Sequence, residues 1–308
     1  MQPLIEIESL SKRFGRLQAV DGVSFTLARG EVLGFLGPNG AGKSTTMKMI
    51  TGFLPPSGGR ASIAGCDVVE RPLAARRHLG YLPEGGPLYG DMTPAGLLAF
   101  VAGLRGLRGR LWRERRDWVV ERLGLAEVWH RPIDTLSKGF KRRVGLAQAI
   151  LHDPEVLILD EPTDGLDPNQ KAGVRDLIHE MSADKAIVLS THILEEVEHL
   201  ADRILLMVGG KLAAAGDFRA IRAKLDEYPY QVRVESPNTR ALAAALIEMP
   251  EVDSVSVGDD GSIVFMTRRL SAVELAIPAM AKDRAIRLLR MQPLDDSLES
   301  VFSYVVEH

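Results

Sequence analysis

The stretch GPNGAGKST, at residues 37–45, constrains the fold of this chain more than any other segment. It directly follows the apolar run EVLGFL and precedes the helical residues MKMI. The spacing G-x-x-x-x-G-K-[ST], placed between a buried strand and a helix, is the pattern of a phosphate-binding loop. Glycines are needed there because side chains would stop the backbone from approaching a phosphate. The sequence therefore predicts an α/β domain that binds a nucleotide.

Each part of this loop has a predicted contact with the nucleotide. The backbone N–H groups wrap the phosphates, and the helix that follows presents its positive end to them. Lys43 neutralises the β- and γ-phosphate oxygens, and the hydroxyl of Ser44 binds Mg²⁺. The residues predicted to bind the nucleotide here are Gly37, Pro38, Asn39, Gly40, Ala41, Gly42, Lys43, Ser44 and Thr45.

The run VLILDEP, at residues 156–162, predicts a second functional strand. Asp160, at the end of its apolar residues, is placed to hold Mg²⁺ through water. Glu161 is predicted to be the general base, or the group that orients water, for attack on the γ-phosphate. A further apolar strand ends in STH and brings His192 to the same sheet edge, as a contact for the γ-phosphate. The alternatives are a carboxylate pair that only starts a turn and a histidine with a structural role.

The chain is long enough for two domains. Apolar runs bounded by turn residues, each followed by a helical segment, predict a buried parallel sheet. Between two of these runs, a stretch rich in Leu, Arg and Ala at about residues 86–150 predicts an inserted helical subdomain. We expect this nucleotide-binding domain to extend over residues 1–225.

The C-terminal residues, 228–308, predict a separate small domain. Strands and helices follow one another in the order β-α-β-β-α-β, which is the ferredoxin-like split motif, and the segment DSLESVFSYVV adds a last helix. Asp-Asp-Gly at 259–261 predicts a hairpin, and Pro278 is expected to kink or end the second helix. The segment has 8 Lys and Arg against 12 Asp and Glu, which favours a regulatory or dimer-forming module over RNA binding.

Composition narrows the classes of function further. The formal net charge is −3, so no global field attracts nucleic acid. Cys66 is the single cysteine, which excludes an intrachain disulfide and fits a reducing compartment. The first residues, MQPLIEIESL, lack the basic and apolar segments of a signal peptide, and the apolar runs fall far short of the roughly 20 residues of a membrane-spanning helix. We expect a chain that does not cross a membrane by itself.

Taken together, the motifs of residues 4 to about 220 resemble the nucleotide-binding subunits of ABC transporters. Beyond the phosphate loop and the Asp160–Glu161 pair, Phe14 resembles the aromatic residue that stacks on adenine. GYLPEGGPLYGDMT resembles the loop that couples to the membrane subunit, with Glu84 where the family usually has Gln. LSKGF resembles the signature LSGGQ, and Asp167 in DGLD lies in the loop that crosses the dimer interface.

The resemblance implies a fold and a mechanism. The fold is a P-loop NTPase core of the ABC ATPase type with its helical subdomain, followed by the α+β ferredoxin-like domain. Two subunits sandwich two ATP molecules, each held by the phosphate loop of one chain and by Ser137, Lys138 and Gly139 of the other. Mg²⁺ is assigned to Ser44, Asp160 and Glu84. Hydrolysis separates the subunits and moves the membrane-spanning partners.

The resemblance also implies partners and a location. One complete set of motifs implies a homodimer on a separate polytopic permease, at the cytoplasmic face of the membrane, and no nucleic-acid partner. The glutamate after LP, the wording NGAGKSTTMK and the acidic C-terminal extension resemble the subgroup that serves ABC-2-type exporters. The alternatives are an ABC ATPase that acts on nucleic acid or ribosomes and a regulatory ATP sensor. Such an ATPase usually has long coiled coils or a second ATPase domain, and a sensor would not need Glu161 and His192.

Two residues of the signature segment depart from the family pattern. Lys138 and Phe140 stand where the family signature has glycine and glutamine. We expect Phe140 to lose a polar contact that glutamine makes, and Lys138 to replace part of it through its charge; the alternative is a lysine that points into solvent. Six arginines at residues 105–118 form either a surface for acidic partners and headgroups or a solvated helical face.

Overall fold

The computed structural model of the chain describes residues 3–191, 197, 199–217, 230–258 and 261–294. The chain divides into two compact units, Met1–Asp217 and Phe218–His308. Among the residues that the structure describes, no helix has both the length and the apolar character needed to cross a bilayer.

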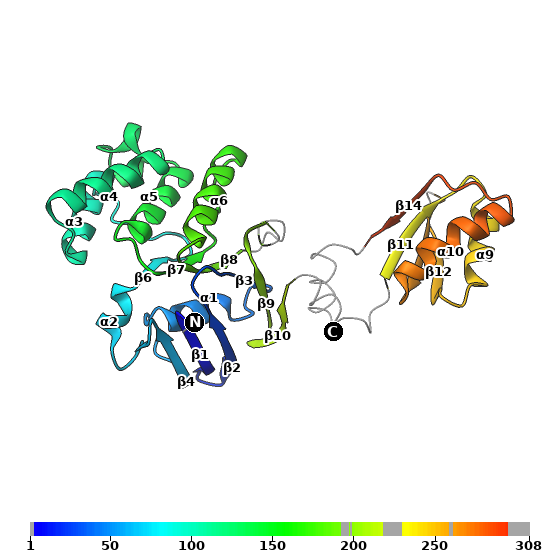
Figure 1. Cartoon of the computed structure of the whole chain (residues 1–308), viewed down its shortest axis with the longest axis horizontal. Helices are drawn as coiled ribbons and strands as arrows, with labels where there is room; N and C mark the ends of the chain where they lie inside the picture. The colour runs from blue at the N-terminus through cyan, green and yellow to red at the C-terminus, as the bar shows by residue number, and fades with distance from the viewer. Residues whose placement is uncertain (1–2, 192–196, 198, 218–229, 259–260, 295–308) are drawn as a thin grey trace. The chain divides into compact units, whose positions relative to one another are not determined.

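A six-stranded sheet forms the centre of the first unit, in the order β10-β9-β3-β8-β7-β6 (Figure 1). Its strands are β3 (Val32–Leu36), β6 (Leu79–Leu82), β7 (Val156–Asp160), β8 (Ala186–Ser190), β9 (Arg203–Val208) and β10 (Lys211–Gly216). All are parallel except β10, which pairs antiparallel with β9 at one edge. Every residue of β3, β7 and β8 is buried, as the apolar runs predict for central parallel strands.

A second sheet of the same unit is antiparallel, in the order β2-β1-β4-β5. Its strands are β1 (Ile5–Phe14), β2 (Leu17–Leu27), β4 (Gly58–Ile63) and β5 (Cys66–Asp67). The helix after the phosphate loop, α1 (Lys43–Ile50), packs with both sheets, and its residues Met47, Met49 and Ile50 are fully buried in their shared core. The core thus fixes the helix that carries Lys43 and Ser44.

The inserted helical subdomain follows β6, as predicted. It consists of α3 (Pro94–Arg105), α4 (Gly109–Arg122), two short 3₁₀ helices (Ala126–Val128 and Ile133–Thr135) and α5 (Lys138–Ile150). Thr93 caps α3 by accepting a hydrogen bond from the N–H of Gly96, at 3.1 Å. The other helices of the unit are α2 (Pro72–Arg77) and α6 (Pro168–Ser182) (Figure 1).

The second unit has the predicted β-α-β-β-α-β order. Its elements are β11 (Tyr230–Glu235), α9 (Thr239–Ile247), β12 (Ser254–Val257), β13 (Ile263–Thr267), α10 (Leu270–Asp283) and β14 (Arg290–Pro293). The antiparallel strand order β12-β13-β11-β14 is that of a ferredoxin-like fold. One face of this sheet packs on α9 and α10 through an apolar core that includes Val232, Phe265 and Ile277.

Three details of this unit differ from the expectation or lie outside the described residues. Pro278 does not end its helix, because α10 continues to Asp283. The segment AIRLLRMQP, the last strand of the predicted order, forms a strand only over Arg290–Pro293. The central Asp-Asp of the hairpin and the segment DSLESVFSYVV lie outside the residues that the structure describes.

Candidate active site

The carboxyl ends of three parallel strands bring the candidate catalytic segments together. The phosphate loop starts directly after β3, and Asp160 ends β7 opposite Ser190, the last residue of β8. Ser190 also aligns with Phe35 of β3. In open α/β sheets, ligands bind outside this edge of the strands.

Two glycines of the phosphate loop are required by the packing around them. Gly37 has φ +156°, and a Cβ atom there would lie 2.3 Å from the carbonyl oxygen of Met207. Gly42, the N-cap of α1, has φ +101°, and its Cβ atom would lie 2.6 Å from the carbonyl oxygen of Ala19. Gly40, by contrast, has nothing within 4 Å of the position of a Cβ atom. The loop is therefore closed on its protein side and open at Gly40.

Lys43 is buried at the start of α1. Its ammonium donates to the carbonyl oxygen of Gly37 at 2.6 Å and to that of Pro38 at 3.1 Å. Burial lowers the pKa of Lys43, and the nearby carboxylates of Asp160, Glu161 and Glu84 oppose this shift of its pKa. The only other buried lysine or arginine residues among those described are Arg142 and Lys185. A buried cation beside open space is a ready counter-charge for a phosphate chain.

A cavity of about 380 Å³ joins most of the predicted residues. Its lining consists of Phe14, Leu17, Ala19, Asn39, Gly40, Gly42, Lys43, Ser44, Thr45, Glu84, Asp160 and Glu161. The ring of Phe14, at one side of this lining, is 47% exposed, and the ammonium of Lys12 lies 5.3 Å from the ring centroid. An exposed ring beside a phosphate loop can stack on a base.

The oxygen atoms around Ser44 fit a magnesium ion that also binds phosphate. Ser190 donates its hydroxyl hydrogen to Oδ1 of Asp160, whereas Oδ2 of Asp160 is buried and has no hydrogen-bond partner. The Ser44 hydroxyl lies 3.5 Å from Oε2 of Glu84. Within the described ranges, no group of three or more His, Cys, Asp and Glu side chains could hold a metal alone. Magnesium is usually held by one or two carboxylates together with phosphate oxygens and water, so this donor set fits only alongside a nucleotide.

Glu161 adopts a backbone conformation that few residues with side chains adopt. Its φ is +53°, and its N–H donates to the carbonyl oxygen of Ser190 at 3.0 Å. The same N–H lies 3.3 Å from the Ser190 hydroxyl oxygen. Strained conformations of this kind are found mostly where the surroundings hold a functional residue in place. Ser190 was not predicted as a site residue, although it begins the STH segment that was singled out for its histidine.

The predicted histidine, His192, lies outside the residues that the structure describes. Thr191, which precedes it, is buried at the end of β8. The placement of His192 as a phosphate contact stays a prediction.

The signature segment begins a helix. Ser137 is the N-cap of α5, and its hydroxyl accepts a hydrogen bond from the N–H of Phe140 at 3.3 Å. Lys138 is exposed, and Gly139 is buried where a Cβ atom would meet Gln170 at 2.7 Å. The lining of the nucleotide cavity, as far as the structure describes it, does not include Ser137, Lys138 or Gly139.

Phe140 has a role within its own helix. The guanidinium of Arg143, one turn further along α5, lies 4.0 Å from the centroid of the Phe140 ring. Arg143 also donates to the carbonyl oxygen of Leu123 at 2.8 Å, at the end of α4. The ring therefore holds, through a cation–π contact that glutamine could not make, the guanidinium whose hydrogen bond ties α5 to the end of α4.

Asp167, predicted in the dimer loop, caps a helix of its own chain. It is the N-cap of α6, and its carboxylate accepts a hydrogen bond from the N–H of Gln170 at 2.9 Å. Nearby, a Cβ atom on Gly165 would lie 3.3 Å from Cβ of Lys138, so the DGLD loop and the signature are neighbours in one chain.

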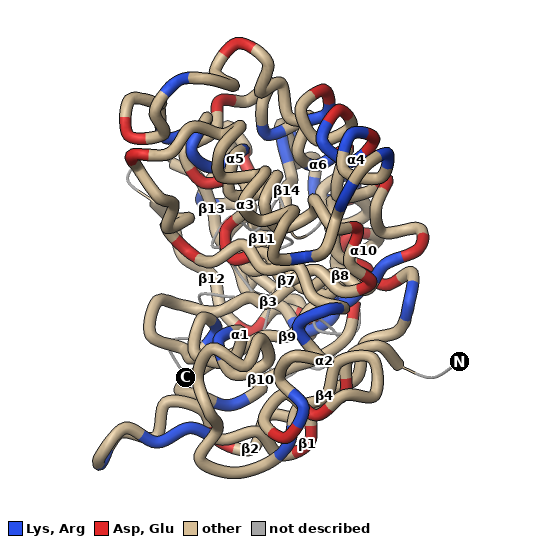
Figure 2. Tube along the Cα trace, turned by 90° about the vertical axis from the view of Figure 1, so that its left-hand side faces the viewer, with Lys and Arg blue, Asp and Glu red and all other residues tan. Residues whose placement is uncertain are grey.

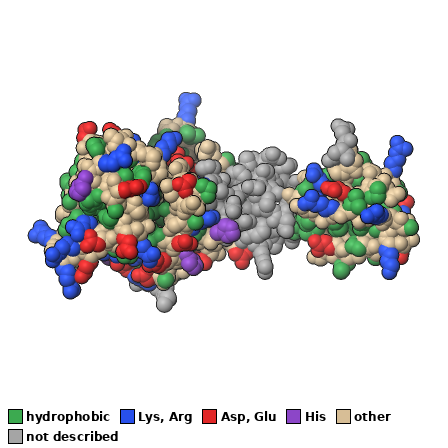
Figure 3. All heavy atoms as spheres, turned by 90° about the horizontal axis from the view of Figure 1, so that it is seen from above, with side chains coloured by type: hydrophobic (Ala, Val, Ile, Leu, Met, Phe, Trp, Pro, Cys, Tyr) green, Lys and Arg blue, Asp and Glu red, His purple; other side chains and the backbone are tan. Residues whose placement is uncertain are grey.

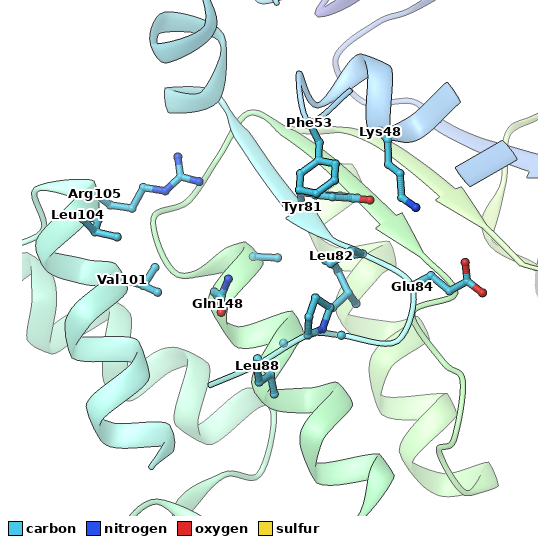
Figure 4. A pocket seen from close by; sticks show the side chains of 15 residues that line it. Lys48, Phe53, Tyr81, Leu82, Glu84, Leu88, Val101, Leu104, Arg105 and Gln148 are labelled. Atoms are coloured by element: carbon cyan, nitrogen blue, oxygen red, sulfur yellow. The ribbon is translucent and has the colours of Figure 1, made fainter. Parts of the chain in front are cut away.

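A second cavity, which we call the apolar groove, lies beside the first. It has a volume of about 540 Å³ and is lined by residues of α1, β6, α3 and α5 and of the segments that follow α1 and β6, including Phe53, Tyr81, Leu88 and Leu104 (Figure 4). Burial raises the pKa of the Tyr81 hydroxyl, so this side chain stays neutral. Glu84 lines the apolar groove as well as the nucleotide cavity, which places it between the two.

Several arginines of residues 105–118 have hydrogen-bond or ion-pair partners within the chain. Arg105 donates to the carbonyl oxygen of Leu79 at 3.1 Å, and Arg115 donates to those of Ile150 and Leu151. Arg110 pairs with Glu114 along α4, where acidic and basic residues alternate (Figure 2). Basic side chains also gather at the end of the first unit where Figure 1 places α3 (Figure 3). These contacts favour a solvated helical face.

Known proteins resemble this chain in sequence and structure. The family model described as "ABC transporter" matches residues 20–164. The probable multidrug ABC transporter ATP-binding protein YbhF of Escherichia coli is 42% identical over 232 residues, which cover 74% of this chain and 40% of YbhF. The linearmycin resistance ATP-binding protein LnrL of Bacillus subtilis is 32% identical over 302 residues, which cover 97% of each. A solved ATP-binding subunit of an ABC transporter has a TM-score of 0.69 and 33% identity, and the match covers 72% of this chain and 93% of that one.

Proposed function

The chain belongs to the ABC transporter ATP-binding family, whose members hydrolyse ATP, and we propose that it is the ATPase subunit of an exporter that drives a separate membrane permease. The observation that carries this proposal is the shared lining of one cavity by the phosphate loop, Asp160 and Glu161. The names of YbhF and LnrL, which concern multidrug transport and linearmycin resistance, support export as the direction of transport.

ATP binding follows from the geometry of the nucleotide cavity. The triphosphate lies along the backbone N–H groups of the phosphate loop, near the positive end of α1. The Lys43 ammonium then exchanges its two carbonyl partners for phosphate oxygens, which carry a full negative charge. Phe14 stacks on the adenine from the exposed side of the cavity.

Hydrolysis requires a positioned water molecule and a stabilised phosphate chain. Glu161 lines the cavity next to the phosphate loop and accepts a proton from the attacking water or orients it. Ser44, Glu84 and Asp160 supply oxygen atoms for Mg²⁺, which neutralises phosphate charge when bound. Ser190 fixes the Asp160 carboxylate through its hydroxyl and the Glu161 main chain through its carbonyl oxygen.

The signature residues act on the nucleotide of a second copy of the chain. Ser137, Lys138 and Gly139 open α5, whose first turn offers unpaired N–H groups to an anion. These residues do not line the nucleotide cavity of their own chain in the part that the structure describes, which fits a composite site made by two copies. Because one chain carries both the phosphate-loop motifs and the signature, two copies of it complete two such sites as a homodimer.

The permease docks at the apolar groove of the first unit. Phe53 and Leu104 are 74% and 71% exposed there, and Lys48 and Arg105 add positive charge among the apolar side chains (Figure 4). We therefore assign to this groove a cytoplasmic segment of the permease that carries apolar side chains and a carboxylate. Such docking holds the chain at the cytoplasmic face of the membrane.

Affinity purification of the tagged full chain from solubilised membranes tests this function. A polytopic membrane protein should co-purify, and it should be lost from a Phe53→Asp, Leu104→Asp variant that keeps nucleotide binding. Co-purification of ribosomes or nucleic acid instead would favour a non-transport ABC ATPase. If the unchanged chain hydrolyses ATP but purifies without any partner, the assignment to a transporter is contradicted.

A further inference from the structure

Arg142 is a buried charge in the second turn of α5. It is 6% exposed, although Lys138 at the start of the same helix faces solvent. Burial lowers the pKa of this guanidinium, and nearby carboxylates, including those of Asp164 and Asp160, oppose the shift of its pKa. A cation is retained in such a place only when its hydrogen bonds compensate for lost water.

The hydrogen bonds of Arg142 join two separate loops. Nη1 donates to the carbonyl oxygen of Pro83 at 3.0 Å, in the loop after β6 that carries Glu84. Nη2 donates to the carbonyl oxygens of both Asp160 and Glu161, at the end of β7. α5 packs against β6 (Figure 1), and the hydrogen bonds of one guanidinium reach the main chain at the ends of both β6 and β7. All three acceptors are main-chain atoms, so the contact fixes backbone positions.

The position of Glu161 depends on being held from two sides. Its left-handed φ of +53° costs conformational energy, and the surrounding contacts must maintain it. Ser190 holds the N–H of this residue at 3.0 Å, and Arg142 holds its carbonyl oxygen. The N–H of Asp164 also donates to this carbonyl oxygen at 3.1 Å, within the same turn. Without the guanidinium, the Glu161 carbonyl loses the contact that ties it to α5.

We infer that Arg142 is a positioning residue for ATP hydrolysis, which fixes the main chain at Glu161 relative to the Pro83–Glu84 loop. The inference rests on the proposed role of Glu161 as the residue that orients water. Arg142 does not line the nucleotide cavity, so we expect it to act through the two loops that it joins. Small displacements of a group that orients water reduce turnover strongly while leaving nucleotide binding nearly unchanged.

Arg115 supplies a matched control on the same helix bundle. It donates to the carbonyl oxygens of Ile150 and Leu151 at 2.8 and 3.0 Å, at the opposite end of α5 from the signature. Its side chain is 18% exposed, and it too holds backbone acceptors with a guanidinium. A variant at Arg115 therefore loses a comparable structural contact away from the nucleotide cavity.

The test compares full-length Arg142→Gln, Arg142→Lys and Arg115→Gln with the unchanged chain. For Arg142→Gln we expect kcat to fall about 10- to 100-fold while KM for ATP changes by less than about threefold. Arg142→Lys should retain more activity than Arg142→Gln, because its ammonium keeps the charge. It should remain less active than the unchanged chain, because the ammonium cannot reach both loops at once. Arg115→Gln should lower the melting temperature and leave kcat near that of the unchanged chain. Unchanged kcat in Arg142→Gln, or an equal loss in Arg115→Gln, would overturn the inference.

Amide hydrogen exchange tests the same inference without turnover. In Arg142→Gln, or in Arg142→Lys if the first variant does not fold, exchange should rise at residues 83–86 and 160–164 and stay unchanged at residues 37–45. An even rise over the whole first unit, or none in these two loops, would refute the positioning role. A full-length chain that hydrolyses no ATP would instead refute the proposed function, and the exchange result would still decide the role of Arg142.

Discussion

The hydroxyl of Ser44 and the carboxylate of Glu84 lie 3.5 Å apart, which joins the first turn of α1 to the loop after β6. Ser44 belongs to the phosphate loop, whereas Glu84 lines both the nucleotide cavity and the apolar groove. A ligand in either cavity therefore meets the same carboxylate. This arrangement would link the bound nucleotide directly to the permease segment that we propose to dock in the apolar groove.

Replacing Glu84 tests its assignment to the magnesium environment. Glu84→Ala removes an oxygen donor, so the Mg²⁺ concentration for half-maximal ATP turnover should rise about tenfold. Glu84→Gln keeps one oxygen donor, so its half-maximal Mg²⁺ concentration should lie between those of the unchanged chain and Glu84→Ala. Titration of turnover with Mg²⁺ at fixed ATP measures the effect. If all three proteins have the same half-maximal concentration, Glu84 has no part in holding the metal.

Lys43→Ala should weaken nucleotide binding about 10- to 100-fold, because the triphosphate loses a buried charged donor. Isothermal titration with a non-hydrolysable ATP analogue measures the affinity directly. Lys211→Ala removes the same charge from an exposed pair with Asp21 and serves as the control. Equal affinity in Lys43→Ala and Lys211→Ala would count against the placement of the triphosphate along the phosphate loop.

Lys138→Gly tests whether the exposed lysine of the signature attracts the partner's phosphates. The variant should dimerise more weakly with ATP at low salt, and the difference should shrink at high salt as the charge contact is screened. The contact contributes about 1 kcal/mol if it stays solvated. Light scattering over a range of salt concentrations measures this. A variant that dimerises as well as the unchanged chain at low salt makes Lys138 a surface residue without this role.

A chain truncated to residues 1–225 tests the second unit. This unit has its own apolar core around Phe265, and we propose that it adds dimer or partner contacts, whereas the nucleotide cavity lies wholly in the first unit. We expect the truncated chain to keep its ATP affinity and to lose dimer stability, permease association or coupling. Behaviour identical to the full chain in all these assays would assign the second unit another purpose.

Where local patterns are strong, the sequence predicted the fold and the strands and loops that carry most of the candidate site residues. The apolar runs became the buried strands β3, β7 and β8, and the glycine spacing of residues 37–45 gave the phosphate loop at the carboxyl end of β3. These features depend on neighbours in sequence, so a linear pattern reveals them. The ferredoxin-like order of the second unit was predicted for the same reason.

Other parts of the site depend on contacts between distant segments. Arg142 is one of three consecutive basic residues, and nothing in their spacing distinguishes the buried one from its neighbours. Ser190 supports Asp160 only because β7 and β8 pair in register. Phe140 was expected only to lose a polar contact, but its ring makes a cation–π contact with Arg143, one helical turn away. Such roles emerge when strands and helices pack.

Steady-state ATP turnover of Glu161→Gln, measured beside the unchanged chain, tests the central claim most directly. The substitution keeps the size of the side chain and removes the carboxylate that orients water. We predict ATP affinity close to that of the unchanged chain, turnover lower by about 10²- to 10⁴-fold, and a dimer that persists in ATP. Turnover equal to that of the unchanged chain would contradict the assignment of Glu161 and, with it, the proposed mechanism.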